Sequence, residues 1–450
     1  MSTAATAELG VIGGGAAATA VWLAAAARLP GAQVLWVAPA GADGTGVAYG
    51  TTDPTHRLNV RALRMSARAD LPGDFVDFLR QRDGGVDELA FYPRADYGDY
   101  LRARLQIAWA GLAGRRWSQR AVAVTRDSAG WNVYGADGEC ARVRQLVLAL
   151  GPQPQCVLPG VAAEALASGR YRLDPYAGLP VVETAPAEIW IIGSGLTAVD
   201  LALSAAQRYP AARLHLLSRH AALPGVHGPH GEAGADLLDG AASYPRVSAL
   251  MRQLRQPRQP GEDWRLRVDS LRARCAERWQ RWPCAERRRF LRHARWLWDV
   301  ARHRMAPEVA DALAALRQAG RLVLHAGRLR AVTLEDDALS LRWQPRGHAD
   351  AVDVRADWVL QATGLNTGVA RASDPLLRSL LDQGLARADD LDLGLATDAA
   401  QRLLGADGRP HQDAYVLGAL ARGSRFECIA MPEIRTHAAA IVAAVWPHDE

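Results

Sequence analysis

Two glycine-rich segments, about 180 residues apart, constrain the fold of this chain more than any other feature. Residues 9–18 read Leu-Gly-Val-Ile-Gly-Gly-Gly-Ala-Ala-Ala, and residues 189–198 read Ile-Trp-Ile-Ile-Gly-Ser-Gly-Leu-Thr-Ala. Each segment predicts a buried strand, a tight turn and a helix whose first backbone N–H groups meet a pyrophosphate. The pair predicts an α/β chain with two Rossmann-like dinucleotide-binding domains that pass electrons between two nucleotides.

The residues at the turns are the first candidates for cofactor binding. They are Gly13, Gly14, Gly15, Ala16 and Ala17 in the first segment, and Gly193, Ser194, Gly195, Leu196 and Thr197 in the second. A Rossmann unit usually carries an acid for the ribose at the end of its second strand. Here Ala38 stands at that place in the first unit, and Asp43 is an alternative ribose contact. The second unit has Ser218 and Arg219 there, which favours NADPH unless Arg219 is only a solvated surface residue.

Composition excludes several classes of protein. All 53 Lys and Arg residues are Arg, so a Schiff-base or P-loop lysine is ruled out and any phosphate or acidic substrate must be held by arginine. The basic residues are dispersed, which argues against nucleic-acid binding. Five cysteines without a C-x-x-C motif argue for a reducing compartment and against a dithiol oxidoreductase. We expect a cytoplasmic protein without a signal peptide, membrane segment or metal site.

A length of 450 residues predicts at least two domains. We expect a discontinuous first domain over 1–180 and 325–450, and a second domain over 181–324 with a helical insertion at about 244–318. Buried strands ending at Gly151 and at Thr363-Gly364 suit the points where the chain leaves and re-enters a nucleotide domain. A last strand ends at Gly418, and a helix then opens at Pro432, Glu433 and Ile434.

Further candidates lie outside the glycine turns. The irregular segment 44–70 contains Tyr49, His56, Asn59 and Arg64, and a long loop in such a fold tends to be functional. In the Trp- and Arg-rich insertion, His303 and Arg304 are candidate cleft residues, although core packing and solvated arginines explain most of that composition.

Several blocks resemble a bacterial FAD/NAD(P)-binding family whose members include the FAD-dependent urate hydroxylase HpyO and the aspartate N-monooxygenase CreE. The longest block is Gly46–Val60, with the pattern G-x-A-Y-x-T-x-D-x-x-H-x-L-N-V. The others are Arg94–Leu101, Gly195–Asp200, Ser218-Arg219, His303–Met305 and Pro432–Arg435. The resemblance spans nearly the whole chain; the missing acid at Ala38 is the departure from the family pattern.

The resemblance implies a two-dinucleotide-binding flavoprotein fold and a flavin-dependent monooxygenase. FAD would occupy the first unit and NADPH the second, and the reduced flavin would use dioxygen to hydroxylate a small polar substrate. Urate hydroxylation to 5-hydroxyisourate is favoured; the alternatives are N-hydroxylation of an amino acid or amine, a non-oxygenating NADPH-flavin oxidoreductase, or a nucleotide-binding sensor.

The resemblance also suggests roles for individual residues. His56 and Asn59 are expected beside the isoalloxazine or the substrate, unless they only brace the loop. Arg64 is expected to hold a substrate anion, unless it is simply solvated. Tyr49, Asn59 and Met65 are expected cofactor contacts, and the helix at 432–434 would stabilise negative charge on the reduced flavin.

Overall fold

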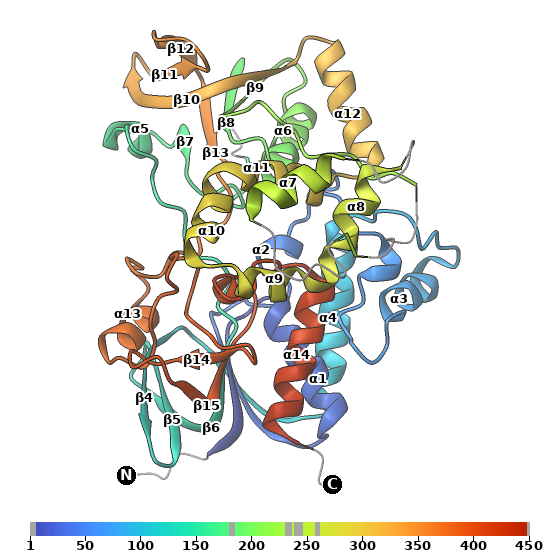
Figure 1. Ribbon diagram of the computed structural model, residues 1–450, viewed down its shortest axis with the longest axis vertical. Helices are drawn as coiled ribbons and strands as arrows, with labels where there is room; N and C mark the ends of the chain where they lie inside the picture. The colour runs from blue at the N-terminus through green and yellow to red at the C-terminus, as the bar shows by residue number, and fades with distance from the viewer. Residues whose placement is uncertain (1–5, 180–184, 230–235, 238–245, 257–261, 448–450) are drawn as a thin grey trace.

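The computed structural model describes residues 6–179, 185–229, 236–237, 246–256 and 262–447. Within them the chain forms two α/β units that lie one above the other along the long axis of the molecule (Figure 1). The domain boundary expected at 180/181 and the insertion start expected at 244 lie outside the described residues.

The first unit is built on an eight-stranded sheet with a parallel core. Its main path runs β14 (Arg402–Leu404), β15 (Pro410–Val416), β6 (Cys140–Leu148), β1 (Ala7–Ile12), β2 (Gln33–Ala38) and β3 (Ala113–Ser118). Strands β4 (Ala121–Asp127) and β5 (Gly130–Gly135) add an antiparallel ribbon to β6. The central strands are apolar almost throughout because both faces of this sheet are covered.

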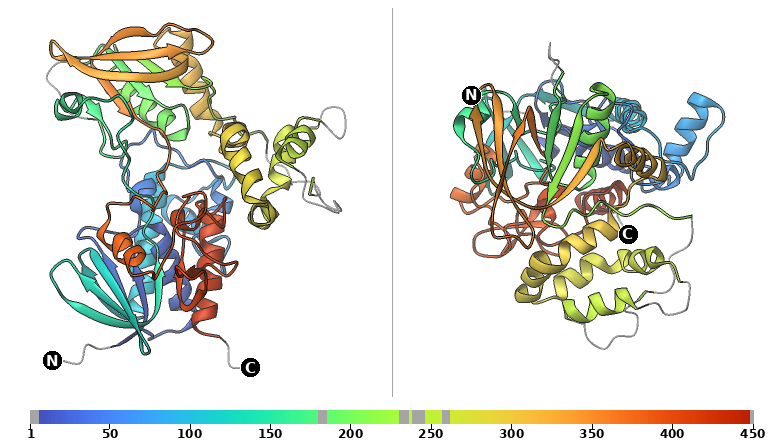
Figure 2. Two further views of the ribbon diagram at one scale, coloured as in Figure 1. Left: turned by 60° about the vertical axis from the view of Figure 1, so that its left-hand side comes forward. Right: turned by 90° about the horizontal axis from the view of Figure 1, so that it is seen from above.

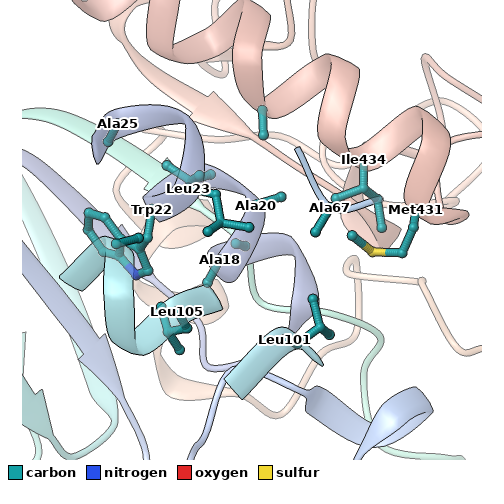
Figure 3. Packing of buried hydrophobic residues seen from close by; sticks show 14 of the residues in the cluster. Ala18, Ala20, Trp22, Leu23, Ala25, Ala67, Leu101, Leu105, Met431 and Ile434 are labelled. Carbon is teal, nitrogen blue, oxygen red and sulfur yellow. The ribbon is translucent and has the colours of Figure 1, made fainter. Parts of the chain in front are cut away.

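Three helices cover one face of the first sheet: α1 (Ala16–Arg28), α4 (Arg94–Ala110) and α14 (Met431–Val445). Helix α1 packs on both of the others, and its buried alanines allow the close approach (Figure 3). Trp22 and Leu23 of α1 supply the large side chains of this core, together with Leu101 and Leu105 of α4. Helix α13 (Pro375–Asp382) packs against the β4–β5 ribbon.

The second unit contains a seven-stranded sheet. Its order is β12 (Val352–Ala356), β11 (Ala338–Pro345), β10 (Leu322–Glu335), β9 (Arg213–Ser218), β8 (Glu188–Ile192), β13 (Trp358–Gln361) and β7 (Tyr171–Arg172). Helices α6 (Leu196–Arg208) and α12 (Pro307–Gln318) pack on one face, and α5 (Ala163–Ala167) packs with β10 and β7 on the other.

The sheet corrects both expected limits of the second domain. Strand β7 and helix α5 already belong to this unit, so the first domain does not extend to residue 180. Strand β10 pairs in parallel with β9 over its first residues and then antiparallel with β11, so the chain stays in the second unit until Gln361, well past residue 324. Helix α12 also belongs to this unit, because Val309 and Leu313 lie in its core. The insertion is therefore shorter than expected and ends before α12.

The insertion projects to one side of the two units (Figure 2). Its described helices are α7 (Val247–Arg255), α8 (Trp264–Ser270), α9 (Cys275–Arg281), α10 (Cys284–Arg289) and α11 (Arg295–Arg302). Its aromatic core includes Phe426 of the first unit, on which Trp279 stacks with ring centroids 4.6 Å apart. Trp279 also donates to the Gly423 carbonyl at 2.7 Å, so the insertion is anchored on the first unit.

Two short helices, α2 (Gly46–Tyr49) and α3 (Asp74–Asp83), lie in the segment between β2 and α4. The two segments that connect the units pair with each other, because the Gln153 N–H donates to the Asn366 carbonyl at 2.7 Å. Among the described helices, none has the length and apolar character needed to span a membrane.

Candidate active site

The first glycine turn has the geometry that its sequence predicts. Gly13 has φ +137°, and its N–H donates to the Val37 carbonyl at 2.9 Å. A Cβ atom at Gly13 would lie 2.1 Å from the Ala149 carbonyl oxygen, so only glycine fits. Helix α1 begins at Ala16, and its first N–H groups, including that of Ala17, have no partner within the helix.

The second turn repeats this geometry closely. Gly193 has φ +138°, donates to the Leu217 carbonyl at 2.9 Å, and a Cβ there would lie 2.1 Å from the Ala362 carbonyl oxygen. Helix α6 begins at Leu196 and continues through Thr197. Both turns therefore place a helix N-terminus at the carboxyl edge of a parallel sheet, where phosphate groups bind in such folds.

The surroundings of the two turns differ. A Cβ atom on Gly15 would lie 3.3 Å from the Cα of Gly46, whereas one on Gly195 would meet nothing within 4 Å. A Cβ on Gly14 would lie 2.5 Å from that of Ala42, whereas Ser194 occupies this place in the second unit and donates to the Ala222 carbonyl at 2.7 Å. The segment after β2 thus covers the first turn, and the second turn is open.

The alternative ribose contact, Asp43, is already engaged. Its carboxylate accepts from the backbone and hydroxyl of Thr45 and from Nε of Arg102 at 2.7 Å. Burial raises the pKa of Asp43, but these donors outweigh it and the pKa is lowered, so the group stays ionised. Asp43 nevertheless lines the cavity beside the turn, together with Arg120 from the β3–β4 connection.

A cavity of about 1790 Å³ begins at the first turn and extends between the units. Its lining includes Gly13, Gly14 and Ala38 of the first unit, and Ser204 and Arg208 of α6. Its size and its contact with the glycine turn fit an extended dinucleotide. The residues present therefore fit FAD at the first unit, although no carboxylate follows β2 directly.

Residues from the end of the chain reach the same turn. Gly418 has φ +81°, and a Cβ there would lie 3.5 Å from that of Ala17. Gly151 also has a positive φ, +74°, two residues beyond the Ala149 carbonyl that faces Gly13. Gly418 therefore approaches the first turn of α1, and Gly151 follows closely after the residue that faces Gly13.

The N-terminus of α14 meets the segment that contains Met65. Met65 is buried in the same core as Met431 and Ile434, and Figure 3 shows Ala67 beside these two side chains. Pro432 occupies the first turn of the helix, as expected. Glu433 forms a bidentate ion pair with Arg272 of the insertion at 2.6 and 2.9 Å, so its carboxylate joins the insertion to α14.

Tyr49 lies inside the first unit. Its ring packs edge-on against Tyr97 with centroids 4.6 Å apart, and burial raises the pKa of its phenol to about 12. Tyr49 therefore stays protonated and acts here as a packing residue between α2 and α4.

His56 lies at the boundary between the units and lines the same cavity as Gly13 and Gly14. Ser204 of α6 donates to Asp53 at 2.5 Å, so the 3.0 Å contact between His56 Nε2 and Ser204 has the histidine as donor. Its Nδ1 accepts from Thr51 at 2.8 Å. Burial lowers the pKa of His56, which keeps the ring neutral. This network fixes the expected catalytic loop to the second unit.

A buried ion pair strengthens the same boundary. Arg94, the first residue of α4, contacts Asp200 of α6 at 2.8 Å, and its Nε donates to the Arg57 carbonyl. Burial raises the pKa of Asp200, and Arg94 opposes that shift. Asn59 contributes through its backbone, whose carbonyl accepts from His227 at 3.0 Å. These contacts hold the Gly46–Val60 block against the second unit.

Arg64 faces a cluster of charges between the first unit and the insertion. Its guanidinium is exposed and has no hydrogen bond or ion pair within the described residues. Desolvation lowers the pKa of Arg64 and Arg272 lowers it further, whereas Glu433 and Asp269 oppose the shift. Arg302 lies 3.6 Å from Glu427. A guanidinium with no hydrogen bond or ion pair among the described residues can bind an anion.

The two candidates from the insertion have different surroundings. His303 lies 3.8 Å from both Asp299 and Glu427, and burial lowers its pKa. Arg304 is buried, and its guanidinium binds Asp269 at 2.9 and 3.0 Å and two backbone carbonyls. Arg304 thus braces the insertion, which corrects its expected place in a cleft.

At the second turn, Ser194 and Ser218 join the turn to the end of β9 through a 2.9 Å hydrogen bond. Arg219 follows with an exposed side chain. Gly364 has φ +93°, and its carbonyl accepts from Gln155 at 2.6 Å, while the Thr363 hydroxyl accepts from Gln361. Thr363 and Gly364 therefore lie at the crossing between the units, directly after the Ala362 that faces Gly193.

Sequence reasoning missed Asp53, Arg94, Asp200 and Ser204 as interacting residues. The first three stand in the blocks that carry the family resemblance, so a signal was present. Ser204 lies one helical turn after Asp200 on α6, which places both on the same face.

Comparisons with known proteins agree with this geometry. Residues 10–153 match a family model described as FAD-NAD(P)-binding. The match lies in the first unit and includes its glycine turn. The flavoprotein-type fold with two Rossmann units is confirmed by solved structures over nearly the whole chain, and no curated protein matches the sequence.

Three solved structures illustrate the likeness. The ornithine N-hydroxylase of Kutzneria sp. 744, described with reduced FAD, NADP⁺ and L-ornithine, has 15% identity, TM-score 0.68 and coverage of 98% of this chain and 99% of its own. The ornithine hydroxylase PvdA of Pseudomonas aeruginosa has 18% identity, TM-score 0.66 and the same coverage. The FAD-bound cadaverine monooxygenase DfoA of Erwinia amylovora has 14% identity, TM-score 0.68 and coverage of 99% and 95%.

Proposed function

We propose that this chain is an FAD- and NADPH-dependent monooxygenase that N-hydroxylates a small amine bearing an acidic group. The observation that carries the proposal is the full-length likeness to N-hydroxylases, in a chain that keeps both glycine turns. The free cation at Arg64 supports an acidic group on the substrate. The resemblance to the family of HpyO and CreE favours urate hydroxylation. This stays a prediction, because the similar solved structures are N-hydroxylases.

The overall reaction would convert an amine, dioxygen, NADPH and a proton into a hydroxylamine, NADP⁺ and water. When bound, FAD supplies the reaction with dioxygen and NADPH supplies the hydride. The N–H groups of α1 and α6 would hold the two pyrophosphates, and Arg219 the 2′-phosphate. Arg64 would orient the substrate's acidic group, with the N-terminus of α14 adding positive potential. His303 lies beside Glu427, which Arg302 also approaches.

The test is a substrate screen with the FAD-loaded protein. NADPH and oxygen consumption are followed with ornithine, lysine, cadaverine, aspartate and urate, and products are analysed by mass. We expect oxygen-dependent NADPH oxidation stimulated by an amine, with a product one oxygen atom heavier. If urate stimulated the reaction and was hydroxylated, the proposal of N-hydroxylation would be wrong and urate hydroxylation would take its place. If NADPH oxidation were equally fast without oxygen, with another electron acceptor, the protein would not be a monooxygenase. A protein that takes up no FAD would contradict the whole proposal.

A further inference from the structure

The end of β9 carries more than the expected Arg219. His220 follows it directly, and both lie beside the turn where Gly195 has open space. The residues at this place read the ribose of a dinucleotide in Rossmann units. Groups that reach them from elsewhere in the fold can therefore contribute to nucleotide recognition.

The sheet register brings a second arginine to this place. Ser218 at the end of β9 pairs with Ala326 of β10, and the Ala326 carbonyl accepts from the backbone N–H of Arg346 at 2.8 Å. Arg346 follows β11, and its guanidinium donates to His220 Nδ1 at 3.3 Å. Arg346 thus extends to the residue next to Arg219, although 127 positions separate the two arginines in the numbering.

The insertion supplies a third group. Trp296 of α11 stacks on the His220 ring with centroids 4.0 Å apart and an interplanar angle of 13°. The neighbouring Trp298 donates to Glu427 of the first unit at 2.8 Å. Helix α11 therefore contacts the first unit on one side and the end of β9 on the other.

The charges around His220 are suited to an anion. Desolvation lowers the pKa of His220, and Arg346 and Arg219 lower it further. Neither arginine has an ion-pair partner among the described residues. Two guanidinium groups that act on the same ring, neither of them paired with a carboxylate, can together hold a doubly charged phosphate.

We propose that Arg346 and Arg219 together clamp the 2′-phosphate of NADPH, and that Trp296 positions His220 within this clamp. The inference rests on the proposed use of NADPH and names the residues that select it over NADH. The insertion would then contribute a side chain to the cofactor site as well as to the region around Arg64.

Binding of two nucleotides tests the clamp without turnover. The FAD-loaded protein is titrated calorimetrically with 2′,5′-ADP, which carries the 2′-phosphate, and with 5′-ADP, which lacks it. Arg346→Ala should bind 2′,5′-ADP about ten- to a hundredfold more weakly, because it loses a charge-assisted contact, and should bind 5′-ADP almost unchanged. Arg342→Ala is the matched control, since Arg342 is exposed on the same hairpin and lies 3.8 Å from Asp353.

The stacking residue has its own variants. Trp296→Ala should weaken 2′,5′-ADP binding by roughly threefold, as expected for a positioning residue, and Trp296→Phe should restore most of it because the ring stack remains. If Arg346→Ala bound 2′,5′-ADP as tightly as the parent, or lost the same affinity for both nucleotides, the clamp would be wrong. The proposed NADPH site would still stand in that case. A parent protein that bound neither 2′,5′-ADP nor NADPH would overturn the proposed NADPH site and the clamp together.

Discussion

In the first unit, the residues after the second strand pack over the glycine turn, whereas in the second unit the same place is open and carries Arg219. Gly13 and Gly193 have φ angles of +137° and +138°, and a Cβ on either would lie 2.1 Å from a carbonyl oxygen. Beyond the turns, Ala42 and Gly46 cover the first unit, and nothing lies within 4 Å of a Cβ on Gly195. The turn sets where a pyrophosphate lies, and its neighbours decide which nucleotide can enter.

The largest expected effect comes from breaking a turn. Gly13→Ala should lower the free energy of unfolding by about 3–5 kcal/mol, because it combines backbone strain with a clash against the Ala149 carbonyl. Gly195→Ala is the control, with φ −79° and open space around the new methyl group. Urea unfolding of both variants measures the difference. Equal stability of the two would refute the close approach at Gly13.

Breaking the boundary between the units should cost less. Arg94→Leu leaves Asp200 buried without its partner, so we expect a loss of about 2–3 kcal/mol in urea unfolding. Arg80→Leu removes an exposed ion pair with Asp77 and should cost less than about 1 kcal/mol. If the two variants lost the same stability, the Arg94–Asp200 pair would not be holding the units together.

Arg64 tests the open face between the first unit and the insertion. Arg64→Gln should raise the KM for an acidic substrate about tenfold, a loss of about 1.4 kcal/mol of binding, with little change in stability. Arg68→Gln is the control because Arg68 pairs with Asp70 at 2.5 Å. Steady-state kinetics on the substrate found in the screen give both values. An unchanged KM in Arg64→Gln would show that Arg64 is a solvated residue that does not bind the substrate.

The smallest effect concerns pH and the contact between the insertion and the first unit. Burial raises the pKa of Glu427, but His303, Arg302 and Trp298 outweigh it, so the folded pKa lies below the usual value. The resulting stability is present above about pH 4.5 and is lost as pH falls through the folded pKa, with a size of about 1 kcal/mol. Urea unfolding between pH 7 and pH 4 should therefore show a shallower loss in Glu427→Gln than in the parent. Glu308→Gln, at an exposed position on α12, is the control and should lose the same stability with falling pH as the parent. If the stability of Glu427→Gln fell with pH as steeply as that of the parent, the effect would be disproved.

Local patterns predicted the turns well and the boundaries poorly. The helix expected after the first glycine turn is α1, because alanine-rich sequence at that place has a high helix propensity. Strand β10 has two different partners along 14 residues, and its sequence does not show where one sheet pairing ends and the other begins. The domain limit at 324 failed for that reason.

Side-chain roles depended on distant partners. The contact between His56 and Ser204 joins residues 148 positions apart, and the Arg304–Asp269 pair joins helix α8 to the segment that follows α11. The blocks that contain His56, Arg94 and Asp200 were recognised as units, but their sequence could not reveal that they face one another. Arg346 gave no local signal because only the pairing of β9, β10 and β11 brings it to Arg219.

Anaerobic reduction of the bound flavin tests the division of roles between the units most directly. The FAD-loaded parent and Gly195→Asp, whose new side chain has open space but would repel a pyrophosphate, are mixed with NADPH without oxygen, and loss of flavin absorbance is followed. We predict that the parent is reduced rapidly, and that Gly195→Asp keeps its flavin and responds to dithionite but only weakly to NADPH. Loss of flavin from Gly195→Asp, or undiminished reduction by NADPH, would contradict the assignment of FAD to the first unit and NADPH to the second.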